Sequence, residues 1–266
     1  MARWHTRWDP PHPHVDPLLT PAGAGVSCDA PADHPWHHAL WFTIKYLNGV
    51  NFWEEYDEFG IQQTRTADVN ANVVRAEIDW VAPDGVTVAA REVRTITEVP
   101  IDDDAYALDW HEVVTPTVDT EYDRTPFTTW GGYSGLTLRG APDWTETQLM
   151  LPDGAQRERV LGEPAEWCSL QGRAARADGT VGIAGVTILD HPENARHPTP
   201  WYGSTRADTY GEGWANFLNA AFLWDGPLTR AAGEPLELRY RVIVHDGPRP
   251  PHRIAADYAT WIGGES

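Results

Sequence analysis

Strict alternation of apolar and charged side chains along residues 73–80 is the sequence feature that most constrains the fold. The apolar positions, which share one face, are Val74, Ala76, Ile78 and Trp80. A period of two residues is typical of a half-buried β-strand and does not fit a helix. The turn sequence Ala82-Pro83-Asp84-Gly85 follows, so residues 86–99 are expected to return as the second strand of a hairpin.

Further β-rich segments recur along the chain, separated by proline, glycine and aspartate. They cover residues 39–47, 105–115, 134–139, 166–174, 181–189 and 236–245. Helical periodicity between them is almost absent, which favours an antiparallel arrangement over alternating strands and helices. The sequence therefore predicts an all-β fold, an antiparallel β-sandwich.

One helical pattern stands near the end of the chain. Ile254, Tyr258 and Trp261 recur at helical spacing after two prolines and before two glycines, which predicts a short C-terminal helix over residues 253–262 that docks on a sheet. No repeat or change in composition divides the chain. We therefore expect a single domain over residues 1–266, with residues 1–20 as a Pro/His-rich N-terminal arm.

The net charge of the chain limits the binding partners that can be expected. The 39 acidic residues against 20 basic ones give a formal net charge of −19, which excludes long-range attraction to nucleic acid or to an anionic membrane. No apolar run is long enough to span a membrane and no secretory signal is present, so a cytoplasmic location is expected. The single lysine, Lys45, is the only candidate for Schiff-base chemistry. The sequence does not predict the oligomeric state.

Two histidine-rich segments each begin with Asp-His-Pro. The first DHP segment, DHPWHH, covers residues 33–38, and the second, DHPENARHPTPW, covers residues 190–201. A carboxylate beside an imidazole orients it for proton transfer and raises its pKa. The candidate acid–base groups are therefore His34, His37, His38 and His197, oriented by Asp33 and Asp190.

We expect the two DHP segments to meet in one cleft. The alternative for each segment is a turn capped by the aspartate, with the histidine packed among neighbours. A divalent metal is a further alternative, since zinc, iron and manganese favour imidazole and carboxylate ligands. The candidate ligands would be His34, His37 and His38 with His191 or His197 and Asp33 or Asp190, but their spacing matches no standard site, so no ligand set is assigned.

Aromatic residues flank both segments in a chain with 14 tryptophans. Trp36, Trp41 and Trp53 surround the first segment, and Trp201 and Tyr202 close the second. A flat ring offers a stacking surface for the C–H face of a sugar, while nearby polar groups bind its hydroxyls. The alternative for each ring is core packing.

At these segments the chain resembles a family of soluble bacterial proteins filed under the name methane oxygenase PmoA. The motifs that carry the resemblance are HPHVDPLLTPAG, DHPWHHALWF, LNGVNFW, AEIDWVAPDG, GIAGVTILDHPENARHPTPWY and LRYRVIVHDG. The resemblance implies a sandwich of the galactose-mutarotase (supersandwich) kind, a place among sugar-catabolic genes, and shared positions that include Asn48. The chain departs from its relatives at Trp130-Gly131-Gly132, which implies a different substrate or reaction.

These observations predict a carbohydrate-active enzyme that hydrolyses, eliminates or epimerises a sugar or sugar derivative, with a small-molecule carbohydrate as its partner. The expected substrate-binding residues are Trp36, Asn48, Trp53, His191, Arg196, Trp201 and Tyr202. Two alternatives stay open at this point: a non-catalytic carbohydrate-binding protein, and a metal-dependent lyase or oxygenase.

Overall fold

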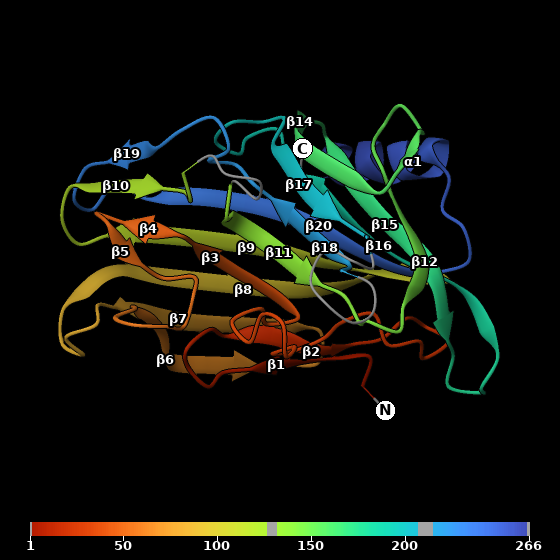
Figure 1. Ribbon diagram of the computed structural model, residues 1–266, viewed down its shortest axis with the longest axis horizontal. Coiled ribbons are helices and arrows are strands. Elements are labelled where there is room, and N and C mark those ends of the chain that lie inside the picture. The colour runs from red at the N-terminus through yellow and green to blue at the C-terminus, as the bar shows by residue number, and fades with distance from the viewer. Residues whose placement is uncertain (1, 127–131, 207–214, 265–266) are drawn as a thin grey trace.

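The computed structural model describes residues 2–126, 132–206 and 215–264. Within these residues the strands form sheets of nine, seven and four strands, and every pairing between them is antiparallel (Figure 1). The two larger sheets share one hydrophobic core. The predicted all-β antiparallel sandwich is therefore confirmed.

The nine-stranded sheet contains the predicted hairpin next to one of its edge strands. Its strands, in spatial order, are β13 (Gln156–Arg157), β12 (Thr145–Met150), β15 (Trp167–Ala175), β16 (Val181–Asp190), β20 (Leu236–Asp246), β9 (Ala105–Pro116), β8 (Val88–Asp102), β7 (Val73–Val81) and β6 (Ile61–Val69). β7 pairs with β8 through a turn in which the Asp84 carboxylate accepts the N–H groups of Val86 and Thr87. Gly85 has a φ of 71°, which a glycine adopts without strain.

The seven-stranded sheet begins with the residues that the sequence suggested as an arm. Its strands, in spatial order, are β1 (Trp4–Arg7), β2 (His14–Leu18), β3 (Leu40–Ile44), β11 (Ser134–Arg139), β18 (Phe217–Ala220), β17 (Pro200–Ser204) and β14 (Arg159–Pro164). Because β1 pairs with β2 and β2 pairs with β3, residues 4–18 of the expected arm are part of the sandwich. The two short strands were not predicted because the proline and histidine residues in this stretch interrupt the alternating pattern of a strand. A small sheet of β19 (Leu228–Arg230), β10 (Thr120–Asp123), β4 (Tyr46–Leu47) and β5 (Val50–Asn51) completes the strands described.

The predicted C-terminal helix is confirmed as α1 (Pro251–Gly263). Ile254 and Trp261 are its buried residues, and they pack with Trp167, Leu189 and Ile243 of the nine-stranded sheet. These sheet residues alternate with those that enter the core between the sheets, so α1 covers the outer face of the nine-stranded sheet. Among the described residues, no helix has the length and apolar character needed to cross a membrane.

A buried ionic cluster lies inside the sandwich. The Arg94 guanidinium on β8 contacts the carboxylates of Glu92 and Glu112 at 2.8 Å, and all three side chains are at most 1% exposed. Indole N–H groups complete the cluster, since Trp80 donates to Glu92 and Trp110 to Glu112. Burial raises the pKa of Glu112 well above its usual range, although Arg94 opposes this. Arg94 also donates to the Pro13 carbonyl at 2.6 Å, which ties the two sheets together.

We predict that Arg94→Ala destabilises the protein by about 3–5 kcal/mol, because it leaves buried carboxylates without their cation. Urea unfolding followed by tryptophan fluorescence measures the change. Arg91→Ala, on the same strand but exposed, serves as the matched control and should change the free energy of unfolding by no more than about 0.5 kcal/mol. An Arg94→Ala loss as small as that of the control would contradict the prediction.

Candidate functional site

The outer face of the seven-stranded sheet carries most of the candidate site. Alternate residues of its central strands point away from the core. On β3 these residues are Trp41 and Thr43, and Lys45 continues the alternation just after the strand. The neighbouring strands add Thr137, Arg139, Phe217, Asn219, Tyr202 and Ser204. All of these side chains are buried, although they face away from the core. Segments 33–38 and 51–56 lie over this face, since their rings contact Trp41 and Phe217.

An aromatic cluster occupies the middle of this face. Its buried members are Trp41, Trp53, Tyr133, Tyr202 and Phe217, with Trp36 and Trp224 packed at its margin. Trp53 stacks on Tyr133 with ring centroids 4.7 Å apart and planes 6° apart. The indole N–H groups of Trp41 and Trp53 are buried and have no acceptor among the described residues. A buried N–H without an acceptor usually marks a place for a water or a ligand oxygen.

Trp36 and Tyr202, two of the residues predicted to bind substrate, lie in or beside the aromatic cluster. Trp53 lies there too, but it is fully buried with one face covered by Tyr133, so it forms a wall and not an open stacking surface. Tyr133 and Phe217 were missed because each is a single aromatic residue at a strand end, with no local pattern to distinguish it from core.

The first DHP segment forms a hydrogen-bonded chain at the edge of the aromatic cluster. Arg139 donates to both carboxylate oxygens of Asp33, at 2.8 and 3.0 Å, and Asp33 accepts from Nδ1 of His34 at 3.0 Å. Burial lowers the pKa of His34 from its ordinary 6.5, and the nearby Asp33 only partly opposes this. The rise in pKa expected from the sequence is therefore wrong for His34, which stays neutral at pH 7.

His37 lies beneath His34, with the two rings stacked at 4.6 Å. It is fully buried, and neither ring nitrogen has a hydrogen-bond partner among the described residues. Burial, together with the charge of Arg139 and the neighbouring histidines, lowers the pKa of His37 well below 6.5. A buried neutral ring of this kind supports His34 by packing and is poorly placed to exchange protons with solvent.

Lys45 is a site residue that the sequence singled out only by its uniqueness. Its Nζ contacts the Glu54 carboxylate and donates to Oδ1 of Asn51 at 3.2 Å, and the side chain is 5% exposed. Burial lowers the pKa of Lys45 to about 8. Lysine is rarely buried without a role, so its burial on this face, with Nζ 4.9 Å from the centre of the Tyr46 ring, marks Lys45 and Glu54 as parts of the site.

A second polar cluster lies where β2 meets β3. His14 on β2 pairs across the sheet with Trp41, so both point to the outer face. His38 bridges two carboxylates, Asp29 at 2.8 Å and Glu55 at 2.5 Å, and these outweigh its burial and raise the pKa of His38 to about 9. Ligand atoms of His14, Asp29 and His38 all lie within 4.8 Å of one another. His12 adjoins them, with its ring centroid 5.4 Å from that of His38.

This cluster differs from the metal ligands considered from the sequence, since only His38 of that set belongs to it. The alternating histidines of HPH, at positions 12 and 14, were the available signal: residues two apart in a strand share a face. Asp29 and Glu55 come from loops and carry no such signal.

The second DHP segment lies elsewhere, and the expected common cleft is wrong. β3 and β17 are separated by β11 and β18, so three antiparallel pairings make them run in opposite directions. The first DHP segment precedes β3, and the second joins β16 to β17 and ends on the first two residues of β17, so the two segments lie at opposite ends of the seven-stranded sheet. The register places the first residues of β3 and β17, Leu40 and Pro200, about 10 Å apart along the strand direction and about 14 Å apart across the sheet.

Contacts within the second DHP segment are those of a local structural loop. The Asp190 carboxylate accepts from His197 Nδ1, Thr199 N–H and the Asn194 amide, as expected of a turn organised by an aspartate. His191 packs edge-on against Trp261 of α1. The roles predicted for Asp190, His191 and His197 at a shared site are therefore corrected.

Three other predicted substrate-binding residues also lie outside the site. Trp201 faces the core between the sheets and donates to the Ala165 carbonyl. Arg196, at a φ of 70°, donates to the Pro227 carbonyl. Asn48 stands in the turn between β4 and β5 and bonds the backbone at Asp119 and Glu121. Of the departure noted at residues 130–132, positions 130 and 131 lie outside the described residues.

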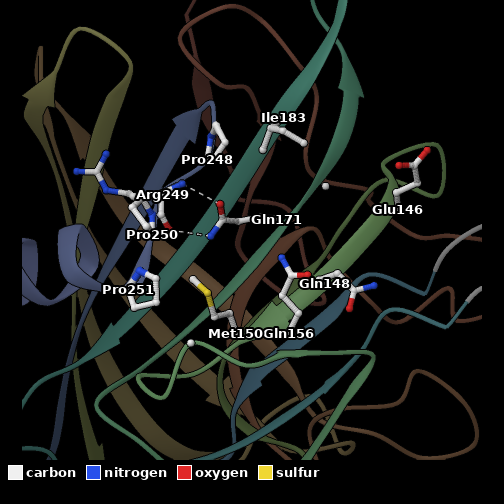
Figure 2. Close-up of a pocket in the computed structure, with 12 residues that line it drawn as sticks. Glu146, Gln148, Met150, Gln156, Gln171, Ile183, Pro248, Arg249, Pro250 and Pro251 are labelled. Carbon is white, nitrogen blue, oxygen red and sulfur yellow. Dashed lines mark hydrogen bonds between the residues drawn. The ribbon is translucent and has the colours of Figure 1, made fainter.

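A separate cavity of about 470 Å³ lies at the other side of the molecule, between β12, β15 and the segment that joins β20 to α1 (Figure 2). Gln171 holds that segment, since its amide donates to the Arg249 carbonyl and accepts the Arg249 N–H. Among the described residues that line it there is no histidine, and Glu146 is the sole acidic one. The cavity thus lacks the paired groups needed for acid–base chemistry.

Fold and site together define an antiparallel β-sandwich with an aromatic, titratable site on the outer face of one sheet. The profile of a family of unknown function, DUF6807, matches residues 1–259. The match covers nearly the whole chain, so the protein belongs to this family. None of the curated proteins matches the sequence.

We predict that the pKa of Lys45 is measurable directly, because a protein labelled with ¹³C-lysine has a single Cε resonance. That resonance should titrate at about pH 8 in the folded protein and near the ordinary 10.5 after unfolding. Glu54→Gln should lower the pKa further, because it removes the carboxylate that stabilises the ammonium. A midpoint near 10.5 in the native protein would show that Lys45 is hydrated and outside the buried site.

Proposed function

We propose that this protein is a carbohydrate-active enzyme whose substrate binds on the outer face of the seven-stranded sheet. The observation that carries the proposal is the combination on one face of aromatic rings, indole N–H groups that lack acceptors, and titratable side chains. Sugars suit such a surface because their C–H faces stack on rings while their hydroxyls accept and donate hydrogen bonds. The resemblance to proteins encoded among sugar-catabolic genes points the same way.

Trp36 and Tyr56 supply the accessible stacking surface in this proposal. Their ring centroids lie 5.5 Å apart, Trp36 is half-buried, and Tyr56 is 51% exposed. Trp36 also contacts His34 edge-on at 5.3 Å. A sugar stacked at this edge therefore lies beside the one histidine of the first DHP segment that combines partial exposure with an aspartate partner.

His34 acts as the general base. Neutral imidazole accepts a proton at pH 7, Asp33 fixes the ring through Nδ1, and Arg139 holds Asp33 in place. Proton abstraction of this kind serves hydrolysis, where the proton comes from water, and elimination or epimerisation, where it comes from a sugar carbon. His37 supports the ring from below, and the Lys45–Glu54 pair supplies charge within the aromatic cluster.

The proposed setting is the cytoplasm. Both cysteines are free thiols, Cys28 half-buried and Cys168 buried, in keeping with a reducing compartment. The partner is a small carbohydrate, and the acidic surface offers no attraction for nucleic acid.

We expect His34→Ala and Asp33→Asn each to reduce kcat by about 100-fold or more, since they remove or misorient the general base. The assay screens monosaccharides, glycosides and keto-glycosides for turnover. His197→Ala is the matched control: it removes a histidine that also bonds an aspartate at 2.8 Å, but at the opposite end of the sheet, and should leave kcat unchanged. Circular dichroism confirms that each variant folds. Equal losses in both histidine variants would contradict the assignment.

Activity should fall as the pH drops through a midpoint below 6.5, because protonation removes the base and burial lowers the pKa of His34. The charged and titratable groups that face it are Asp33, Arg139 and His37. The pH profile of kcat/KM measures this midpoint. A midpoint above 6.5 would contradict the assignment of His34.

Trp36→Ala should instead weaken sugar binding, raising KM with little effect on kcat, because a stacking ring contacts ground state and transition state alike. Tyr258→Ala, on helix α1 at the other face of the sandwich, is the control. Sugar binding that depends on Trp36, without turnover of any substrate in the screen, would favour a carbohydrate-binding protein over an enzyme.

A further inference from the structure

We propose that His14, Asp29 and His38 form a binding site for a divalent transition metal ion of the zinc type. The site lies on the same outer face as the aromatic cluster but is argued from its own contacts and does not depend on the proposed function. Its ligand atoms are Nε2 of His14, Oδ1 of Asp29 and Nδ1 of His38, all within 4.8 Å of one another.

The hydrogen bonds around His14 determine which of its nitrogens can bind a metal. Nδ1 lies 2.8 Å from the carbonyl oxygen of His12. A carbonyl only accepts, so Nδ1 carries the hydrogen and Nε2 of the neutral ring carries a lone pair. That lone pair is buried, has no hydrogen-bond partner among the described residues, and lies 3.4 Å from Oδ1 of Asp29.

His38 shows the same division of roles. Its Nε2 lies 2.5 Å from the Glu55 carboxylate and its Nδ1 lies 2.8 Å from Asp29 Oδ1. In the neutral tautomer whose Nε2 donates to Glu55, Nδ1 carries a lone pair directed at the same oxygen of Asp29. A histidine that donates its outer N–H to a carboxylate or carbonyl while its other nitrogen binds a metal is the usual arrangement in metal sites.

In these neutral tautomers two nitrogen lone pairs and a carboxylate oxygen converge on one point. In the metal-free protein the proton of His38, whose pKa is raised to about 9, lies between Nδ1 and Asp29, and a bound metal ion takes the place of that proton. The 3.4 Å separation of His14 Nε2 and Asp29 Oδ1 matches the spacing of two ligands about 2.0–2.1 Å from a tetrahedral ion. Imidazole with carboxylate favours zinc, iron or manganese over calcium and magnesium.

The neighbourhood suits a functional site. His12 is 1% exposed and its Nε2 has no hydrogen-bond partner among the described residues, while its Nδ1 faces the Gln62 side-chain oxygen at 3.3 Å. Gln62 in turn donates to the Phe42 carbonyl, which fixes its amide orientation. Asp29 is 35% exposed on its side chain, so one side of the site reaches solvent and an ion can enter.

Metal binding to the whole protein tests this assignment without any sugar. The protein is treated with a chelator, dialysed, and titrated with Zn²⁺ by calorimetry and with Co²⁺ by visible absorption. We expect one ion per chain and the d–d bands of Co²⁺ bound to nitrogen and oxygen. His14→Ala, Asp29→Asn and His38→Gln should each weaken affinity by about 100-fold or more, and Glu55→Gln by about 10–100-fold because it only orients His38.

His111→Ala is the matched control, since His111 also bonds a glutamate at 2.8 Å but stands on the nine-stranded sheet; its affinity should equal that of the unmodified protein. Asp29→Asn changes a partly exposed side chain, so it reports on binding even if a histidine variant unfolds. Uptake of less than one ion per chain, or full uptake by Asp29→Asn and His14→Ala, would overturn the assignment and leave a hydrogen-bonded cluster held together by a proton.

Discussion

The rest of the sandwich depends on the buried ion pairs that the Arg94 guanidinium forms with Glu92 and Glu112. Removing this cation and the carboxylates of Glu92 and Glu112 from water is costly, and the ion pairs and the two indole N–H groups offset that cost. Arg94 also donates to the carbonyl of Pro13, the residue just before β2 of the facing sheet. The charge inside the core therefore also fixes the backbone between His12 and His14, so a core interaction sets the position of the cluster of His14, Asp29 and His38.

The central strands β3, β11, β18 and β17 of the seven-stranded sheet are buried on both faces, and the two faces have different chemistry. Leu40, Phe42 and Ile44 of β3 enter the core, while Trp41 and Thr43 face outward beneath covering loops. Loops cover the outer face although it contains polar groups. Water would otherwise form hydrogen bonds with these groups, so once covered they need another partner. The indole nitrogens of Trp41 and Trp53 are such groups. This is the physical reason for proposing that a ligand binds here and not in the cavity near Gln171.

Sequence patterns predicted the structural elements that are determined by residues close together in the chain. The hairpin of β7 and β8 and the helix α1 have local signals, and both form close to the expected bounds. The pairing of distant strands has no such signal. Whether the two DHP segments meet depends on how many antiparallel steps separate β3 from β17, and this number cannot be read from either segment. The two segments share the Asp-His-Pro motif but have different roles. The first borders the aromatic cluster, and the second forms a turn organised by Asp190.

Both proposed sites depend on one closed loop, residues 28–39. Its ends are held by Ala39 N–H donating to the Cys28 carbonyl, and its middle by Ala30 N–H donating to the His37 carbonyl. Since the loop supplies Asp29 and His38 to one cluster and Asp33 and His34 to the other, its backbone geometry positions both. A short loop closed at two places loses little further entropy when a ligand binds, which is the condition for holding acid–base and metal-binding groups in place before the ligand arrives.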